Sequence, residues 1–342
     1  MKSSLLTTII IFSGIFLCSL SIGWIKKPDP VNNESIRIAV GKSIPVLQKS
    51  SDVFINKVHC ASCHHSLLTS MVVELAKRKG IQIEDSFAVK RTMAAVGNII
   101  YAGDINKCGE FLNVKLFAPY ILMGLAAEKY PADLNTDLAV AFMMSEAKTD
   151  GSFPGEYQRV PLESGHIHTT AVIIHAIQLY ASPALKPQVD AMVAKTSYWL
   201  ENRNPTSQAE LDYQLMGLTW CSSGDAKKKE VVKRIMALQK ADGGWAQLPT
   251  MNSDGYATGQ TLYALYMSGM LQASDANSQR ALNYLLKTQE ANGTWFVQAR
   301  SFPIQPFVNS QFPPGDENQF ISAAATNWAS LALMETLPDK TN

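Results

Sequence analysis

The stretch LQKADGGWAQLPTMNSDGYATGQTLYALYMSGM, Leu238–Met270, sets the pattern that the rest of the chain varies. A polar turn with glycine and an aromatic residue comes first, and an apolar helix rich in small residues follows it. Two copies of the turn share one spacing: Gln239, Gly243 and Trp245, then Gln289, Gly293 and Trp295. An earlier and looser copy has Asp150, Gly151 and Phe153. Repeated units of this kind bury their apolar faces against one another, so the repeat decides the fold.

Helical periodicity dominates from Val53 onward, and two kinds of helix alternate. Six spans are apolar on most faces, which predicts buried helices: Leu67–Lys79, Phe117–Lys129, Thr169–Ala181, Tyr213–Cys221, Gly259–Met270 and Ala323–Glu335. Others carry one apolar stripe and a polar face: Asp133–Lys148, Pro187–Asn202, Ala226–Lys240 and Ser274–Gln289. The interval between the buried spans is roughly 40 to 50 residues, the length of a helix pair. The pattern therefore predicts about six helix pairs, closed into a ring or stacked as an open solenoid.

The glutamine, glycine and tryptophan turns resemble the end of the QW motif of squalene–hopene cyclases and protein prenyltransferases. The resemblance extends over most of residues 55 to 338 and is best in the two late copies. It implies an all-α fold, an (α/α) toroid over residues 53 to 338. It also implies a structural role for the motif, in which glutamine ties the outer helix to the next turn and tryptophan stacks there.

The chemistry of the two families does not follow from the resemblance. Cyclases of this type protonate an alkene with an Asp-x-Asp-Asp motif, and the sequence contains none. Protein prenyltransferases bind zinc through Asp, Cys and His. Asp254 could take the Asp position, but no cysteine follows it. Whether the chain is an enzyme therefore stays open at the level of sequence.

Composition and the N-terminal residues limit the class and the cellular location expected for the protein. The chain has 342 residues, is 46% hydrophobic and 17% charged, and has a net charge of +1, so it lacks the basic surface of a nucleic-acid-binding protein. Residues 1 to 24 carry an apolar run that reads as a signal peptide or a membrane anchor. Residues 25 to 52 read as a linker and a short lead-in helix. We expect an exported protein, periplasmic or anchored to the membrane through this N-terminal segment alone.

The strongest chemical motif is Cys60-Ala61-Ser62-Cys63-His64, which has the C-x-x-C-H form of a c-type haem attachment site. Positions i, i+3 and i+4 of a helical turn share one face, so two thioethers and an iron ligand can reach one haem. We expect covalent haem on Cys60 and Cys63 with His64 as the metal ligand, and a role in electron transfer or redox sensing with a redox partner. Two alternatives remain, a Cys60–Cys63 disulfide in a non-catalytic scaffold and a zinc site.

A second candidate site lies where the buried helices begin. In a closed ring these starts point free N–H groups at one rim, which suits a polar ligand. The candidate pocket residues are His65, His166, His168, Asp254 and Tyr256. The site would bind a terpenoid, polyprenyl-like or sugar-like small molecule. The structural alternative is that Asp212, Asp254 and Thr169 cap helices, and we expect His175 to be a packed core histidine.

Overall fold

The computed structural model describes residues 30–84, 86–102, 114–155, 165–300 and 308–340, and within them every regular element is a helix. Six helices face outward: α1 (Asn33–Val58), α3 (Ala88–Ala102), α6 (Leu134–Ser145), α8 (Lys186–Glu201), α10 (Asp225–Ala237) and α12 (Ala276–Thr288). Six lie inside them: α2 (Leu68–Arg78), α5 (Val114–Ala127), α7 (His166–Tyr180), α9 (Gln208–Trp220), α11 (Gly255–Met267) and α13 (Gln319–Glu335). A π-helix, Cys63–Leu67, precedes α2, and a 3-10 turn, Pro183–Leu185, precedes α8.

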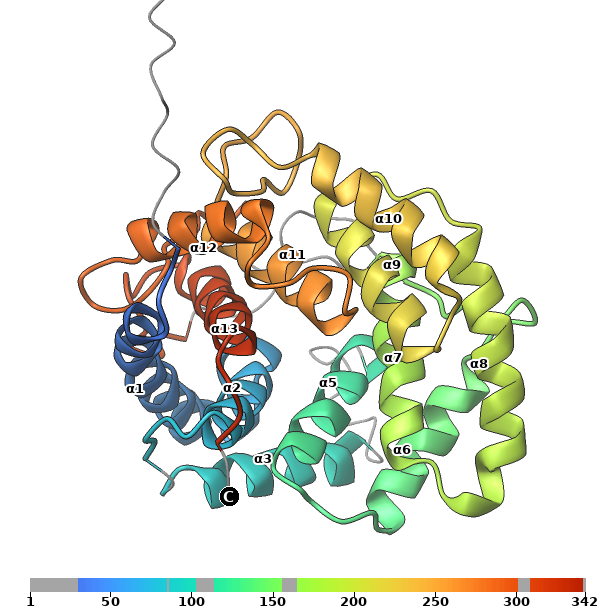
Figure 1. Cartoon of the computed structure of the whole chain (residues 1–342). Helices are drawn as coiled ribbons and strands as arrows, with labels where there is room; N and C mark the ends of the chain where they lie inside the picture. Colours follow the sequence, from blue (N-terminus) through green and yellow to red (C-terminus); the bar gives the residue numbers. More distant parts are fainter. Residues whose placement is uncertain (1–29, 85, 103–113, 156–164, 301–307, 341–342) are drawn as a thin grey trace, which may run out of the picture. The chain divides into compact units, whose positions relative to one another are not determined.

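The inner helices form a closed ring (Figure 1). Each contacts the next in chain order, and α13 contacts α2, so the last pair closes onto the first. The outer helices surround this ring and pack on neighbouring inner helices. The predicted all-α toroid of six pairs is confirmed, and the open solenoid is excluded. The segment expected as a linker and short lead-in helix is different, because α1 is long and supplies the outer helix of the first pair.

The sequence accounts for where several helices begin. Asn32 accepts a hydrogen bond from the Ser35 amide at 2.8 Å and starts α1. Asp133 and Thr136 form a reciprocal capping box at α6. These caps satisfy backbone N–H groups that the helix itself leaves without partners, so they fix where each helix starts.

Small residues let inner helices approach closely. Gly259 of α11 packs on α13, and a Cβ built there would lie 2.5 Å from the backbone nitrogen of Ala329. Only glycine permits that approach, because any larger residue would push the two helices apart. The small-residue composition of the buried spans therefore serves the tight inner ring.

The repeated turn acts as a staple, which we define as Gln239, Gly243 and Trp245 in one copy and Gln289, Gly293 and Trp295 in the other. The Gln239 amide donates to the carbonyls of Gly243 and Asn277, both at 2.9 Å, and Asn277 belongs to the next outer helix. The Gln289 amide donates to the carbonyls of Gly293 and Ala39, and Ala39 belongs to α1. The second staple therefore joins the last outer helix to the first and helps to close the ring.

The aromatic residue of the staple is bound through its backbone and its indole. The indole N–H groups of Trp245 and Trp295 donate to carbonyls of the preceding outer helix at 2.8 and 2.9 Å. Their backbone amides donate to threonine hydroxyls of the following inner helix, and the Phe153 amide of the looser copy donates to Thr170 in the same way. Hydrogen bonds therefore hold both tryptophans in place, whereas the resemblance implied that they stack.

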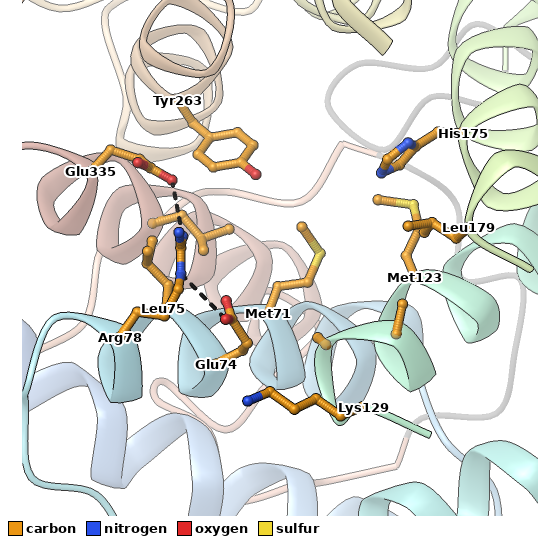
Figure 2. Close-up of a pocket in the computed structure, with 13 residues that line it drawn as sticks. Met71, Glu74, Leu75, Arg78, Met123, Lys129, His175, Leu179, Tyr263 and Glu335 are labelled. Carbon is orange, nitrogen blue, oxygen red and sulfur yellow. Dashed lines mark ion pairs between the residues drawn. The ribbon is translucent and has the colours of Figure 1, made fainter. Parts of the chain in front are cut away.

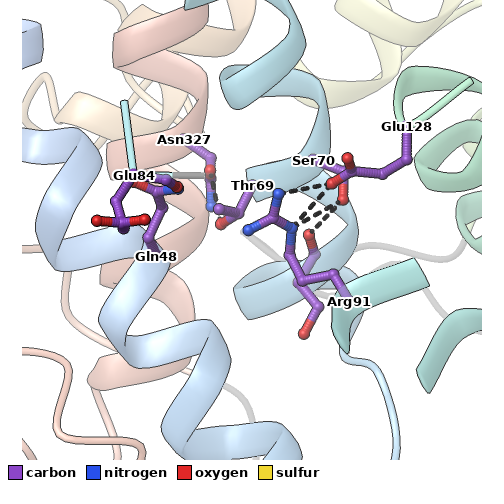
Figure 3. Close-up of polar contacts among 8 residues, drawn as sticks. Gln48, Thr69, Ser70, Glu84, Arg91, Glu128 and Asn327 are labelled. Carbon is purple, nitrogen blue, oxygen red and sulfur yellow. Dashed lines mark hydrogen bonds and ion pairs between the residues drawn. The ribbon is translucent and has the colours of Figure 1, made fainter. Parts of the chain in front are cut away.

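Polar contacts also hold the first pairs together (Figure 3). Thr69 of α2 donates to Asn327 of α13 at 3.2 Å, across the point where the ring closes. Arg91 of α3 forms a buried ion pair with Glu128 at 2.6 Å and donates to the Ser70 hydroxyl at 3.3 Å. Breaking such a buried pair leaves an uncompensated charge, so these contacts fix α3 against α2 and the end of α5.

The predicted leader, residues 1 to 24, lies outside the described residues. Among the helices that the structure describes, none combines the length and apolar character needed to cross a bilayer.

Candidate functional site

A cavity of about 270 Å³ lies inside the ring, near the C-terminal ends of the inner helices. We call it the ring cavity. Its wall includes Met71, Met123, Leu179 and Tyr263, which come from four different inner helices (Figure 2). Cavities with mostly apolar walls and a few polar groups are typical of small-molecule sites. Methionine adapts to ligand shape because its side chain is unbranched and polarisable.

Charged side chains stand at the edge of the ring cavity (Figure 2). Arg78, the last residue of α2, lies 3.2 Å from Glu74 and 4.0 Å from Glu335. Lys129 lines the same cavity just beyond the end of α5 and is exposed. The cavity therefore has an apolar interior and an edge of mixed charge.

His175 lines the ring cavity and is not a fully packed core residue as predicted. It is half-buried, and its ring stacks on Trp220 with centroids 4.2 Å apart and planes 5° from parallel. Burial lowers the pKa of His175 to about 4, so the imidazole is neutral near pH 7. His175 is not fully packed because α7 turns this face toward the ring cavity.

Side chains of the inner helices α5, α7 and α9 meet inside the ring. The Tyr120 hydroxyl lies 2.8 Å from His168 Nε2 and 2.6 Å from the Tyr213 hydroxyl, and each pair shares a hydrogen bond. Tyr213 also stacks on His168 at 3.9 Å. Tyr120 and Tyr213 belong to helices that α7 separates, so their hydroxyls meet inside the ring.

Gln260 and Tyr256 of α11 extend this contact network. The Gln260 amide donates to the hydroxyls of Tyr213 and Tyr256 at 3.4 and 3.3 Å. We call the five residues the polar layer: Tyr120, His168, Tyr213, Tyr256 and Gln260. All five are buried. The layer contains His168 and Tyr256, two of the five predicted pocket residues.

The Cys-x-x-Cys-His turn lies next to the polar layer. Burial raises the pKa of Tyr120 and of Tyr213 well above the usual value, and the nearby Cys63 thiol raises both further. Burial also raises the pKa of Cys63 to about 12 and lowers that of His64 to about 4. At neutral pH the turn therefore carries a protonated thiol and a neutral imidazole.

Haem, disulfide and zinc at this turn all stay predictions. The structure forms no disulfide between Cys60 and Cys63. Among the described residues, no group of three His, Cys, Asp or Glu side chains is placed to hold a metal ion.

His65 and His166 lie outside the polar layer. His65 is buried between α1 and the segment before α13, stacked on Phe54 at 5.3 Å and 2.9 Å from the Ser310 hydroxyl. His166 is exposed, and its Nδ1 accepts a hydrogen bond from the Gly155 amide at 3.1 Å. Neither side chain points at the polar layer, because neighbouring positions on a helical turn face different directions.

Of the three residues expected to cap helices, only Asp254 does so. Asp254 caps α11, accepting from the Ala257 amide at 2.8 Å and from Gln247 at 2.7 Å, and burial raises its pKa to about 6. The expected capping role of Asp212 is wrong, because Ser207 caps α9 instead. The expected capping role of Thr169 is wrong as well, because it lies inside α7, after Gly165 at the cap position.

The ring cavity lies at the opposite end of the inner helices from the predicted pocket, and His168 does not line it. Sequence reasoning missed Met71, Arg78 and Tyr263, although a signal existed. Met71, Glu74 and Arg78 recur at helical spacing in a span otherwise predicted to be buried, so they share one face of that helix.

No protein-family model and no curated protein matches this sequence. The fold is similar to that of the type II terpene cyclase MstE from Scytonema, with 13% identity over 90% of this chain and 99% of the other, and a TM-score of 0.58. A variant of MstE in complex with its substrate geranylgeranyl dihydroxybenzoate gives 14% identity, coverage of 89% and 98%, and the same TM-score. These similarities show the α/α-toroid fold of the type II terpene cyclases.

Proposed function

We propose that this protein binds a small, largely apolar molecule of isoprenoid type in the ring cavity. The observation that carries the proposal is the cavity itself, lined by residues of five inner helices, with methionine, leucine, alanine and tyrosine side chains inside the charged edge. Such a wall favours a terpenoid over a sugar, because a sugar requires many polar partners. The substrate complex of MstE, a protein of the same fold, is consistent with a prenyl ligand.

The cavity supports binding rather than acid-initiated cyclisation. Its two carboxylates, Glu74 and Glu335, face Arg78 at the edge of the cavity. Burial raises the pKa of Glu335, but its carboxylate lies at the edge of the cavity and away from the apolar interior where an alkene would bind. The chain also lacks the Asp-x-Asp-Asp motif, so the function proposed is that of a binding or carrier protein.

Farnesol binding to the full-length protein, measured by isothermal titration calorimetry, tests this function. Met123→Trp fills the cavity wall and should weaken farnesol binding at least tenfold, because the ligand loses its space. Met93→Trp is the matched control, since Met93 is 69% exposed on α3, and it should bind farnesol like the wild type. Maltose should not bind. Equal farnesol affinity of the wild type and Met123→Trp, with both folded by circular dichroism, would refute the proposal.

We propose a c-type haem on Cys60 and Cys63 as a second function for testing, with His64 as the iron ligand. It is favoured by two partly exposed cysteines that no disulfide joins to each other, followed directly by a histidine on the same turn. The neutral imidazole of His64 is the form that coordinates a metal. Electron transfer with a redox partner in an exported setting would follow from this haem.

The haem proposal is tested by expression in a host competent for cytochrome c maturation. A Soret band and a covalent haem stain after denaturing electrophoresis are expected. Cys63→Ala should remove both, and Cys221→Ala, which changes a buried cysteine at the end of α9, should retain them. A colourless wild-type protein from that host would rule the haem out.

A further inference from the structure

Four of the described inner helices, α2, α5, α9 and α11, end in the same backbone turn. The residue after each enters the left-handed region, with φ values of 66°, 58°, 54° and 70° at Gly80, Lys129, Ser222 and Gly269. Two amides of each turn donate back to carbonyls of the helix, as those of Lys129 and Tyr130 donate to Ala126 and Leu125. Glycine is the usual residue at the left-handed position of such a turn.

Lys129 is the member of this set that the backbone explains least. A side chain in the left-handed region has a steric cost that glycine avoids. Among the described residues, none forms an ion pair or a hydrogen bond with the Lys129 ammonium group, and the neighbouring Glu128 is paired with Arg91 at 2.6 Å. Lys129 lines the ring cavity, whereas Gly80, Ser222 and Gly269 do not. Costly backbone conformations are often kept at binding sites, so the cavity supplies a reason for lysine here.

The charges at the edge of the ring cavity favour a ligand with one negative charge. Arg78 lies 3.2 Å from Glu74 and 4.0 Å from Glu335, so carboxylates of the chain balance its charge. Figure 2 shows the extended side chain of Lys129 at the same edge, with no ion pair to Glu74. A single ammonium group is therefore available to a ligand. The two nearby carboxylates would repel a diphosphate, which has several negative charges, more strongly than a carboxylate.

We infer that the ligand of the ring cavity is an isoprenoid carboxylic acid and that Lys129 binds its carboxylate. The isoprenoid chain lies along Met71 and Met123, which line the apolar interior. This inference rests on the proposed isoprenoid-binding function and adds the head group of the ligand. Lys129 is then a specificity-determining residue, at a position where glycine would suit the backbone better.

Farnesoic acid and methyl farnesoate test the head group, because they share one chain and differ in charge at about pH 7.5. Each is titrated into the full-length protein by isothermal titration calorimetry. The acid should bind about fivefold more tightly than the ester, the ratio expected for an ion pair at a partly exposed site. This preference should shrink at about 0.5 M salt, because salt screens exposed charges.

Three variants assign the preference to the charge of Lys129. Lys129→Gln removes the charge at similar length, so it should weaken binding of the acid about fivefold and leave the ester unchanged. Lys129→Arg keeps a positive charge and should keep the preference. Lys233→Gln is the matched control, because Lys233 is an exposed lysine of α10, a helix that does not line the ring cavity. It should bind both probes like the wild type.

Glycine substitutions separate the backbone of this turn from ligand binding. Lys129→Gly and Ser222→Gly each place glycine at a left-handed position, so both should raise the urea midpoint of unfolding. Only Lys129→Gly should lose the preference for the acid, because Ser222 does not line the ring cavity. Loss of the preference in a variant that has become more stable cannot result from misfolding.

The contrary outcomes are distinct. If the acid and the ester bind equally well, or if Lys129→Gln keeps the preference, the inferred head group is wrong while isoprenoid binding stands. If farnesyl diphosphate binds more tightly than farnesoic acid, a carboxylate is the wrong class of head group. If neither the acid nor the ester binds, the proposed function itself fails.

Discussion

Two groups of glutamines in this ring differ in how fully their side-chain amides are hydrogen-bonded. Gln239 and Gln289 in the staples are half-buried, and each amide donates to two backbone carbonyls that join neighbouring outer helices. Gln260 and Gln208 on inner helices are fully buried, yet each has a carbonyl oxygen without a partner. A buried polar residue with all its partners stabilises the fold, whereas one with an unpaired acceptor stabilises it less, because burying that oxygen is costly.

The staple tryptophans should give the largest effect on stability. Trp295 is 1% exposed, and Trp295→Ala removes its packing and the indole hydrogen bond to Leu285. We expect a loss of about 3 to 5 kcal/mol in the free energy of unfolding, measured by urea denaturation. Phe296→Ala next to it changes a side chain that is 47% exposed and should stay within about 0.5 kcal/mol. Similar losses for both variants would contradict the structural role of the staple.

Exchanging the two kinds of glutamine for leucine sharpens the comparison. Gln289→Leu removes the amide donor that Gly293 and Ala39 share, and we expect a loss of about 1 to 3 kcal/mol. Gln260→Leu removes an unsatisfied acceptor along with its two bonds, so its stability should change by less than about 1 kcal/mol. Urea denaturation of both variants measures this, and a larger loss for Gln260→Leu would contradict the distinction between the two groups of glutamines.

The smallest effect concerns pH, and it tests the buried acid beside the polar layer. Burial raises the pKa of Asp212 to about 8, although Gln208 and Thr261 hydrogen-bond to it. The folded state keeps this proton up to about pH 8, and the unfolded chain loses it near the ordinary value of 3.8. Stability from this group is therefore complete below pH 3.8 and is lost as the pH rises to about 8.

Asp212→Asn should flatten this decline. The clearest window is pH 6.5 to 8, because the pKa of Asp254 is raised only to about 6. There the wild type should lose up to about 1.4 kcal/mol per pH unit relative to the variant, seen as diverging urea midpoints. Parallel midpoints across the window would show that Asp212 is ionised in the folded protein.

The architecture followed from sequence because periodicity is a local property. The buried span predicted at Phe117–Lys129 is helix α5, and the striped span at Pro187–Asn202 is helix α8, each with its bounds shifted by only a few residues. A helix with small and apolar residues on every face is stable only when it is buried. Because such helices alternate with helices that have one apolar stripe, the chain forms an inner and an outer ring.

The candidate site was predicted in part. His168 and Tyr256 were found because they stand at helix starts, and a closed ring brings those starts together. His65 pointed elsewhere because it lies on another face of the same turn, packed against Phe54 and Phe312. The ring cavity escaped prediction because it depends on which side chains five inner helices leave short of contact, and the spacing of Met71, Glu74 and Arg78 indicates only the part of the wall that α2 supplies.

Sequence by itself determined the helices, their pairing, the staple spacing and the presence of one Cys-x-x-Cys-His turn, since each depends on residues close together in the chain. Tertiary structure alone decided that Tyr120 meets Tyr213 over α7, that Gln289 reaches Ala39 in α1, and that Gln260 retains an unused acceptor. These contacts join residues dozens to hundreds of positions apart, and ring closure sets them because it fixes the distance and facing of every helix at once.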